Sequence, residues 1–160
     1  MHRLLKWLVV VAFIASLPLT VQALDAQERR TFTITEAEIN ESPLLSRVSN
    51  FIPRFQADLQ PNQVTVLTTF KIGSRSIDVL SVLRSEVSER RITWALEQSA
   101  VNNPLIDEMN LDTLTLSVRR LLEDIVFDYT FKRADIRYAL EDVSIDEDAL
   151  VVTFQTKSSS

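Results

Sequence analysis

The chain has 160 residues and a formal charge of −5, with one Gly, no Cys and a single His at position 2. We expect the first 23 residues to be removed on export, which leaves a mature chain without His or Cys and excludes Ser-His-Asp and Cys-His nucleophiles, redox dithiols and ordinary zinc sites. An acidic chain with scattered Lys and Arg also argues against nucleic acid as a partner, because phosphate backbones repel it.

The N-terminal residues have the pattern of a secretory signal. Two basic residues come first, residues 7–19 are almost wholly apolar, and the small residues Val21 and Ala23 precede the expected cleavage site. An uncleaved membrane anchor is the alternative, but the apolar run is shorter than the roughly 20 residues of a spanning helix and contains a proline. With no Cys behind the run to carry a lipid, the sequence predicts a signal peptide over 1–23 and a single secreted or periplasmic domain over 24–160.

The first predicted helix begins inside the segment TFTITEAEIN, behind a polar lead-in over 24–30 that we expect to be loose. Thr35 has the position of an N-cap, and Glu38, three residues later, completes a capping box with it. A Ser-Pro pair at 42–43 either kinks the helix or restarts it, since Ser is a good cap and Pro fits the first helical position. Residues 51–53 then end the helix.

After this helix the apolar residues recur at every second position, which is typical of antiparallel strands. Residues 55–72 form a hairpin around a Pro61-Asn62 turn, and residues 75–100, behind a loop at Gly73, hold two longer strands. Long strands with one apolar face usually curl around a core element instead of lying flat. We therefore expect the sheet to wrap around a helix.

Behind a turn at 102–105, apolar residues recur with the period of an α-helix, and this is the clearest helical pattern in the chain. Beyond the helix, a last hairpin over 136–154 turns at the acidic run 146–148, and the end of the chain from 157 frays. The apolar stripe of the helix consists of Leu114, Val118, Leu121, Leu122, Ile125 and Tyr129.

Without His and Cys, the numerous side chains that could act as a catalytic acid or base are those of Asp and Glu. The enzyme hypothesis to consider is therefore a pair of carboxylates like that of a glycosidase. Glu36, Glu38 and Glu41 are close in sequence, but they lie in the first helical turns, where the helix dipole favours negative charge. The acidic run from Asp142 lacks the Gly and Glu that a calcium loop needs at its sixth and twelfth positions. A lone Gly cannot build a phosphate-binding loop. We therefore predict no catalytic residues, no metal and no cofactor.

Aromatic and basic residues leave two interpretations open. Trp94 and the phenylalanines are core residues by default, and the alternative is that some of them line a cavity for an apolar ligand, which the sequence does not distinguish from a core. Basic pairs at 29–30, 90–91, 119–120 and 132–133 are typical of a solvated rim, and would touch anionic lipid headgroups if the fold brought them together. Transient contact with a membrane surface is therefore an expectation that depends on the fold.

Four features occur in order along the chain: the export signal, the helix entry ITEAEIN followed by LL, the strand and turn ITWALEQSAVNNPLI before an amphipathic helix, and the closing hairpin YALEDVSIDEDALVVTF. Together they resemble prokaryotic proteins similar to the tubular lipid-binding superfamily, which includes the bactericidal permeability-increasing and synaptotagmin-like lipid-binding domains. Asn103, in place of Gly before the proline, and Pro43 inside the first helix depart from that pattern.

The resemblance implies an α+β single domain in which a long bent antiparallel sheet wraps around a long amphipathic helix, with an N-terminal helix and a C-terminal hairpin. It also implies a non-catalytic exported protein that holds lipid or another apolar small molecule in a groove, with a role in envelope lipid transport. The rival hypothesis is a secreted protein-interaction or scaffolding module with a solid core. The candidate groove residues are Ile39, Leu45, Val48, Val66, Phe70, Val79, Trp94, Leu96, Leu114, Val118, Leu121 and Ile125.

Overall fold

The computed structural model describes residues 28–88, 91–103, 106, 108–134 and 138–156. The predicted signal peptide, its cleavage site and the C-terminal end expected to fray lie outside these residues. Within them the chain has an α+β fold, as the sequence predicts. In chain order the elements are β1 (Arg29–Thr35), α2 (Glu36–Asn40), α3 (Pro43–Val48), β2 (Arg54–Gln60), β3 (Gln63–Ile72), β4 (Arg75–Ser88), β5 (Arg91–Val101), α4 (Glu108–Thr130), β6 (Tyr138–Ile145) and β7 (Ala149–Thr156).

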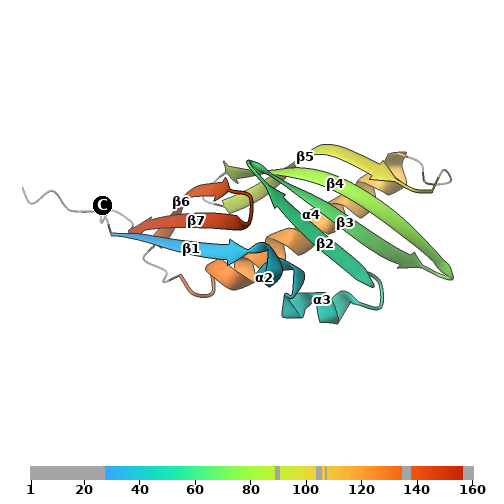
Figure 1. Ribbon diagram of the computed structural model, residues 1–160, viewed down its shortest axis with the longest axis horizontal. Helices are drawn as coiled ribbons and strands as arrows, with labels where there is room; N and C mark the ends of the chain where they lie inside the picture. Colours follow the sequence, from blue (N-terminus) through green and yellow to red (C-terminus); the bar gives the residue numbers. More distant parts are fainter. Residues whose placement is uncertain (1–27, 89–90, 104–105, 107, 135–137, 157–160) are drawn as a thin grey trace, which may run out of the picture.

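The strands form two separate antiparallel sheets (Figure 1). Sheet A has the order β1-β7-β6, and sheet B has the order β2-β3-β4-β5. The prediction of one long bent sheet wrapped around the helix is therefore wrong for the described residues, in which no single curled sheet joins these strands.

Sheet A contains a strand, β1, that the sequence did not predict. The polarity of residues 24–30 predicts a loose lead-in, yet β1 begins at Arg29 and pairs with β7 along all seven of its residues. Its alternate side chains Phe32 and Ile34 belong to the core, as expected for a half-buried strand. β1 thus takes the β7 edge of the terminal hairpin, while β6, the other edge strand of sheet A, contacts β4 without forming a ladder with it.

The hairpins lie where the alternating pattern places them. The turn between β2 and β3 contains Asn62 with a φ of 68°, and the turn between β3 and β4 contains Gly73 with a φ of 62°. These are left-handed conformations, which Gly and Asn adopt more readily than other residues. The turn between β6 and β7 falls at 146–148, also as predicted.

A core of buried side chains draws on both sheets and on α4. Along β2, β3 and β4 the buried residues occur at every second position, so one face of sheet B is packed and the other is more exposed. β7 alternates in the same way, with Leu150, Val152 and Phe154 buried. The two-residue period in the sequence therefore identified the packed faces correctly.

The first predicted helix is two short helices, each with its own cap. Glu38 N–H donates to the Thr35 hydroxyl at 3.2 Å, and Thr35 N–H donates to the Glu38 carboxylate at 2.8 Å, which is the predicted capping box. Ser42 caps α3 and Pro43 occupies its first turn. Of the two alternatives at 42–43, the structure shows a restart.

Two polar side chains of α2 attach it to the edge of sheet B. The Glu36 carboxylate accepts a hydrogen bond from Leu59 N–H at 3.0 Å. The Asn40 side chain accepts from Ala57 N–H at 2.7 Å and donates to the Ala57 carbonyl at 2.9 Å. The amide of Asn40 thus pairs with β2 as a neighbouring strand would, and α2 covers an edge that would otherwise be open to another strand.

α4 lies against sheet B, and its C-terminal end reaches β1 of sheet A (Figure 1). The Tyr129 hydroxyl donates to the Glu38 carbonyl at 3.0 Å, which ties α4 to α2. None of the described helices is both long enough and apolar enough to cross a membrane. The buried residues of α4 are Thr115, Val118, Leu121, Leu122, Ile125, Val126 and Thr130.

Candidate functional site: a groove beside Phe127

Most of the residues predicted to line an acyl groove are buried in the core. Leu45, Val48 and Leu114 are half-buried, and Leu96 is 36% exposed. The predicted faces are therefore apolar and packed, while their contact with a ligand stays a prediction. The buried members are Ile39, Val66, Phe70, Val79, Trp94, Val118, Leu121 and Ile125.

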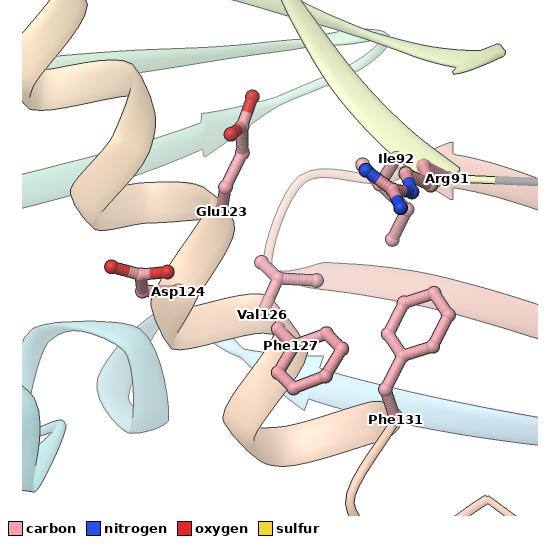
Figure 2. Close-up of a pocket in the computed structure, with 7 residues that line it drawn as sticks. All are labelled: Arg91, Ile92, Glu123, Asp124, Val126, Phe127 and Phe131. Carbon is pink, nitrogen blue, oxygen red and sulfur yellow. The ribbon is translucent and has the colours of Figure 1, made fainter.

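A hollow of about 460 Å³ opens beside the C-terminal half of α4, where the start of β5 approaches the helix (Figure 2). Its volume lies within the roughly 300–1,000 Å³ range of small-molecule sites. Its walls combine apolar and charged side chains, as such sites commonly do. The lining residues are Arg91, Ile92, Glu123, Asp124, Val126, Phe127 and Phe131.

A second hollow, of about 250 Å³, shares Asp124 and Phe127 with the first and continues toward α3. Phe127 is therefore a ridge between two adjoining hollows. We call the two together the Phe127 groove. The residues that line the second hollow are Leu44, Arg47, Val48, Leu121, Asp124, Phe127, Asp128 and Lys132.

The apolar wall of the groove is an aromatic stack of Phe127, on α4, and Phe131, in the turn that follows α4. The rings of Phe127 and Phe131 lie 5.1 Å apart between centroids and 14° from parallel. Phe131 also contacts the buried ring of Phe154 edge-on, with centroids 5.1 Å apart, so the stack is anchored to the core at one end. Phe127, at the other end, is 52% exposed. The groove thus presents a rigidly supported aromatic surface to solvent.

Opposite charges line the first hollow without pairing. Figure 2 shows the Arg91 guanidinium on the β5 side and the Glu123 carboxylate on the α4 side, while the Asp124 carboxylate points away from Arg91. Among the described residues, none of these three side chains forms a hydrogen bond or an ion pair. In the second hollow, by contrast, Lys132 donates to Asp128. The first hollow therefore holds unpaired charges of both signs beside an apolar wall.

The helical periodicity explains why sequence reasoning found part of this groove and missed the rest. Leu121 and Val48 are among the predicted groove residues and line the second hollow. Phe127 lies outside the apolar stripe of α4, and Phe131, just past the end of the helix, lies beside it because its N–H donates to the Phe127 carbonyl at 3.0 Å. A large aromatic residue away from the buried face of an amphipathic helix is the sequence signal that could have indicated an exposed site. Ile92 and Leu44 join the groove only through tertiary packing, and no pattern near them indicated it.

Two further hollows contain other predicted residues. Leu114 lines one of about 360 Å³ between the N-terminal half of α4 and the β3–β4 turn. Leu45 lines another of about 360 Å³ between α3 and the start of β2. The apolar residues predicted for one groove are therefore distributed over the core and several separate surface hollows.

The carboxylates considered for catalysis have structural partners or stand alone. Glu36 and Glu38 are bonded to backbone groups, as described above, and Glu41 is exposed. In the described part of the chain, no three His, Cys, Asp or Glu side chains are grouped so that they could hold a metal ion. The groove offers contact surfaces and fixed charges for binding.

Comparison with known proteins adds no relative to this description. No protein-family model matches the chain, and no curated protein matches its sequence at a significant level.

Proposed function

We propose that this protein binds a lipid-like amphiphile in the Phe127 groove and carries it between membranes of the cell envelope. The observation that supports this most directly is the stacked pair of Phe127 and Phe131 that forms one wall of the 460 Å³ hollow. The resemblance of the chain to tubular lipid-binding proteins and its predicted export signal support the same conclusion. No catalytic role is part of this proposal.

The exposed ring of Phe127 gives a ligand apolar surface to cover, and covering it lowers the free energy of the complex. An aromatic ring that is half in water gains about 25 cal/mol for each Å² of apolar surface that a ligand covers. Exposed apolar surface of this kind, bordered by charged residues, commonly marks a binding site. An acyl chain laid across the two rings would cover them without any change in the core, since Phe131 is already held by Phe154.

The position of the groove differs from the interior channel that the resemblance implies. Val118, Leu122 and Ile125 are fully buried against the sheets. The two hollows of the Phe127 groove lie on the outer flanks of α4 instead. We therefore place the proposed ligand at the surface of α4, with the predicted groove residues of the core supporting it from beneath.

A protein-interaction module is the second candidate, and one surface favours it. On the exposed face of sheet B the register sets Leu67 opposite Leu80, and Leu80 opposite Ala100. Leu80 is 39% exposed. Such an apolar row across three strands would suit a protein partner. It lies on the face of sheet B that points away from the core, so variants can test it separately from the groove.

The test compares two substitutions on α4. Phe127→Ala removes the exposed ring from the groove, and Leu116→Ala removes a side chain of similar exposure, 41%, that lines none of the hollows described above. Binding is measured by titration with fluorescent single-chain amphiphiles of one chain length. We expect Phe127→Ala to weaken binding about tenfold and Leu116→Ala to leave it unchanged. Equal binding by both variants and the wild type, or no binding at all, contradicts the proposal.

Mass spectrometry of organic extracts from the purified native protein provides an independent test. A co-purifying amphiphile that is lost from the Phe127→Ala variant supports the groove. If the protein carries no lipid, and if protein partners that copurify with it are lost when Leu80 is replaced, the interaction module is favoured.

A further inference from the structure

We propose that the Phe127 groove selects amphiphiles with a zwitterionic headgroup, whose anionic part binds Arg91 and whose cationic part binds Glu123. This inference rests on the proposed function, because it names the headgroup of the ligand whose chain covers the aromatic wall. It gives a role to the side chains of Arg91 and Glu123, which form no ion pair or hydrogen bond within the described part of the chain.

The charged side chains of the first hollow do not stabilise the fold through pairing. Arg91 and Glu123 line the same hollow, yet neither forms an ion pair or a side-chain hydrogen bond within the described part of the chain. Elsewhere on the surface, Arg29 pairs with Glu141 and Arg84 pairs with both Glu86 and Glu97. The charges of the hollow are therefore available to a ligand.

The lining of the hollow limits the sign of the ligand's charge. A purely anionic headgroup would meet Arg91 but also the repulsion of Glu123, which lines the same hollow. A purely cationic headgroup would meet the repulsion of Arg91. A headgroup with one charge of each sign can pair with Arg91 and Glu123 at once. Headgroups with a single charge are disfavoured, because Glu123 repels an anion and Arg91 repels a cation. The lining is thus complementary to a zwitterion.

Figure 2 shows how the charges lie around the hollow. Arg91 projects from the start of β5 and Glu123 from α4, on opposite sides of the hollow, with Val126 and the two phenylalanine rings on the wall between and below them. A headgroup that spans the two charges leaves its chain directed along the aromatic wall. The phosphate and ammonium of a phospholipid headgroup supply one charge of each sign, and a guanidinium binds phosphate through a fork of N–H donors.

The side chain of Arg91 is exposed, so solvent screens its contribution, and the expected selectivity is moderate. Wild-type protein is titrated with four single-chain amphiphiles of equal chain length below their micelle concentrations. These are a lysophosphatidylcholine, a fatty acid, an alkyltrimethylammonium and a monoacylglycerol. We expect the lysophosphatidylcholine to bind about fivefold more tightly than the other three.

The variants assign the two charges separately. Arg91→Gln is expected to weaken lysophosphatidylcholine about fivefold and to strengthen the alkyltrimethylammonium, because the repulsive cation is gone. Glu123→Gln is expected to weaken lysophosphatidylcholine similarly and to strengthen the fatty acid. Arg120→Gln and Glu147→Gln are the matched controls, since both residues are exposed and lie outside the hollow. The controls should keep the wild-type order of affinities.

Failure of this inference differs from failure of the proposed function. If all four amphiphiles bind the wild type equally, or the fatty acid binds best, headgroup selection is overturned and lipid binding stands. If soluble phosphocholine binds as tightly as lysophosphatidylcholine, the chain contributes nothing, and the proposed function is overturned while the charge assignment stands. If neither phosphocholine nor any amphiphile binds, both are wrong.

Discussion

Asn40 illustrates how single residues of the segment ITEAEIN determine the packing of the N-terminal region. Thr35 and Glu38 close the capping box, while Glu36 and Asn40 bond to the backbone of β2 from successive turns of α2. Ile39 is fully buried between these polar contacts. Every acidic or amide residue of this motif up to Asn40 therefore has a structural partner.

Asn40→Ala is expected to destabilise the fold by about 1–3 kcal/mol, because it leaves the N–H and the carbonyl of Ala57 without their side-chain partner at the edge of sheet B. Urea denaturation gives the free energy of unfolding. Asn50→Ala, at an exposed position in the turn after α3, is the control and should change stability by less than about 0.5 kcal/mol. Equal effects of the two substitutions would show that the Asn40 bonds do not form in solution.

Thr68 and Ser81 show the opposite case, polar side chains that the fold does not satisfy. Both are fully buried on the packed face of sheet B, and their hydroxyl oxygens have no hydrogen-bond partner among the described residues. The register sets Thr68 opposite Val79 and Ser81 opposite Val66, so the hydroxyls stand among aliphatic side chains. A buried hydroxyl without a partner costs stability.

Thr68→Val keeps the shape of the side chain and removes the hydroxyl, so we expect it to leave the free energy of unfolding unchanged or to raise it by about 1 kcal/mol. Thr65→Val, on the other face of the same strand, corrects for the intrinsic preference of valine for strands. Thermal unfolding of both variants provides the comparison. A loss of stability confined to Thr68→Val would reveal a bonding partner for this hydroxyl.

At the scale of elements, α4 has two functions on two faces. One face packs against the sheets, and the 3.6-residue period predicted its centre, Val118, Leu121, Leu122 and Ile125. Val126 is also buried there but was not predicted. The other carries Phe127 beyond the edge of that stripe, where it forms the ridge of the groove. A single helix thus joins the core to the proposed site.

Val118 lies in the middle of the packed face and is completely buried. Val118→Trp should overpack the core and destabilise the protein by about 1–3 kcal/mol. Leu116→Trp, two residues away and 41% exposed, should have little effect. Chemical denaturation distinguishes the two. If Val118→Trp is as stable as the wild type, the core contains room for a bulky group, and an interior ligand channel becomes the better explanation.

At the scale of the whole molecule, the strands of the two sheets do not pair with one another, but the sheets share one core, and Asn62 N–H of the β2–β3 turn donates to the Ile145 carbonyl of β6 at 3.1 Å. β4 and β6 bring sheet B and sheet A into contact, and α4 touches strands of both. The groove lies at the end of α4 that approaches sheet A, since Phe131 of the groove packs on Phe154 of β7. The proposed site therefore depends on how both sheets and the helix assemble.

The export prediction is tested on the secreted protein itself. N-terminal sequencing should find Leu24 as the first residue, because Val21 and Ala23 provide the small side chains that a signal peptidase requires. Met1 retained on protein from a membrane fraction would contradict both the cleavage and the proposed role as a free carrier.

The sequence by itself determined the local structure of this protein: the capping box at Thr35, the hairpin turns and the packed faces of the strands and of α4. These features depend on neighbours within a few residues, whose spacing the chain displays directly. Only the tertiary structure decided that β1 pairs with β7, that the strands divide into two sheets, and that Arg91, Glu123 and Phe127 line one hollow. Such contacts join residues far apart along the chain. The periodicity of an element indicates which of its faces is buried, but not which other strand or helix packs against it.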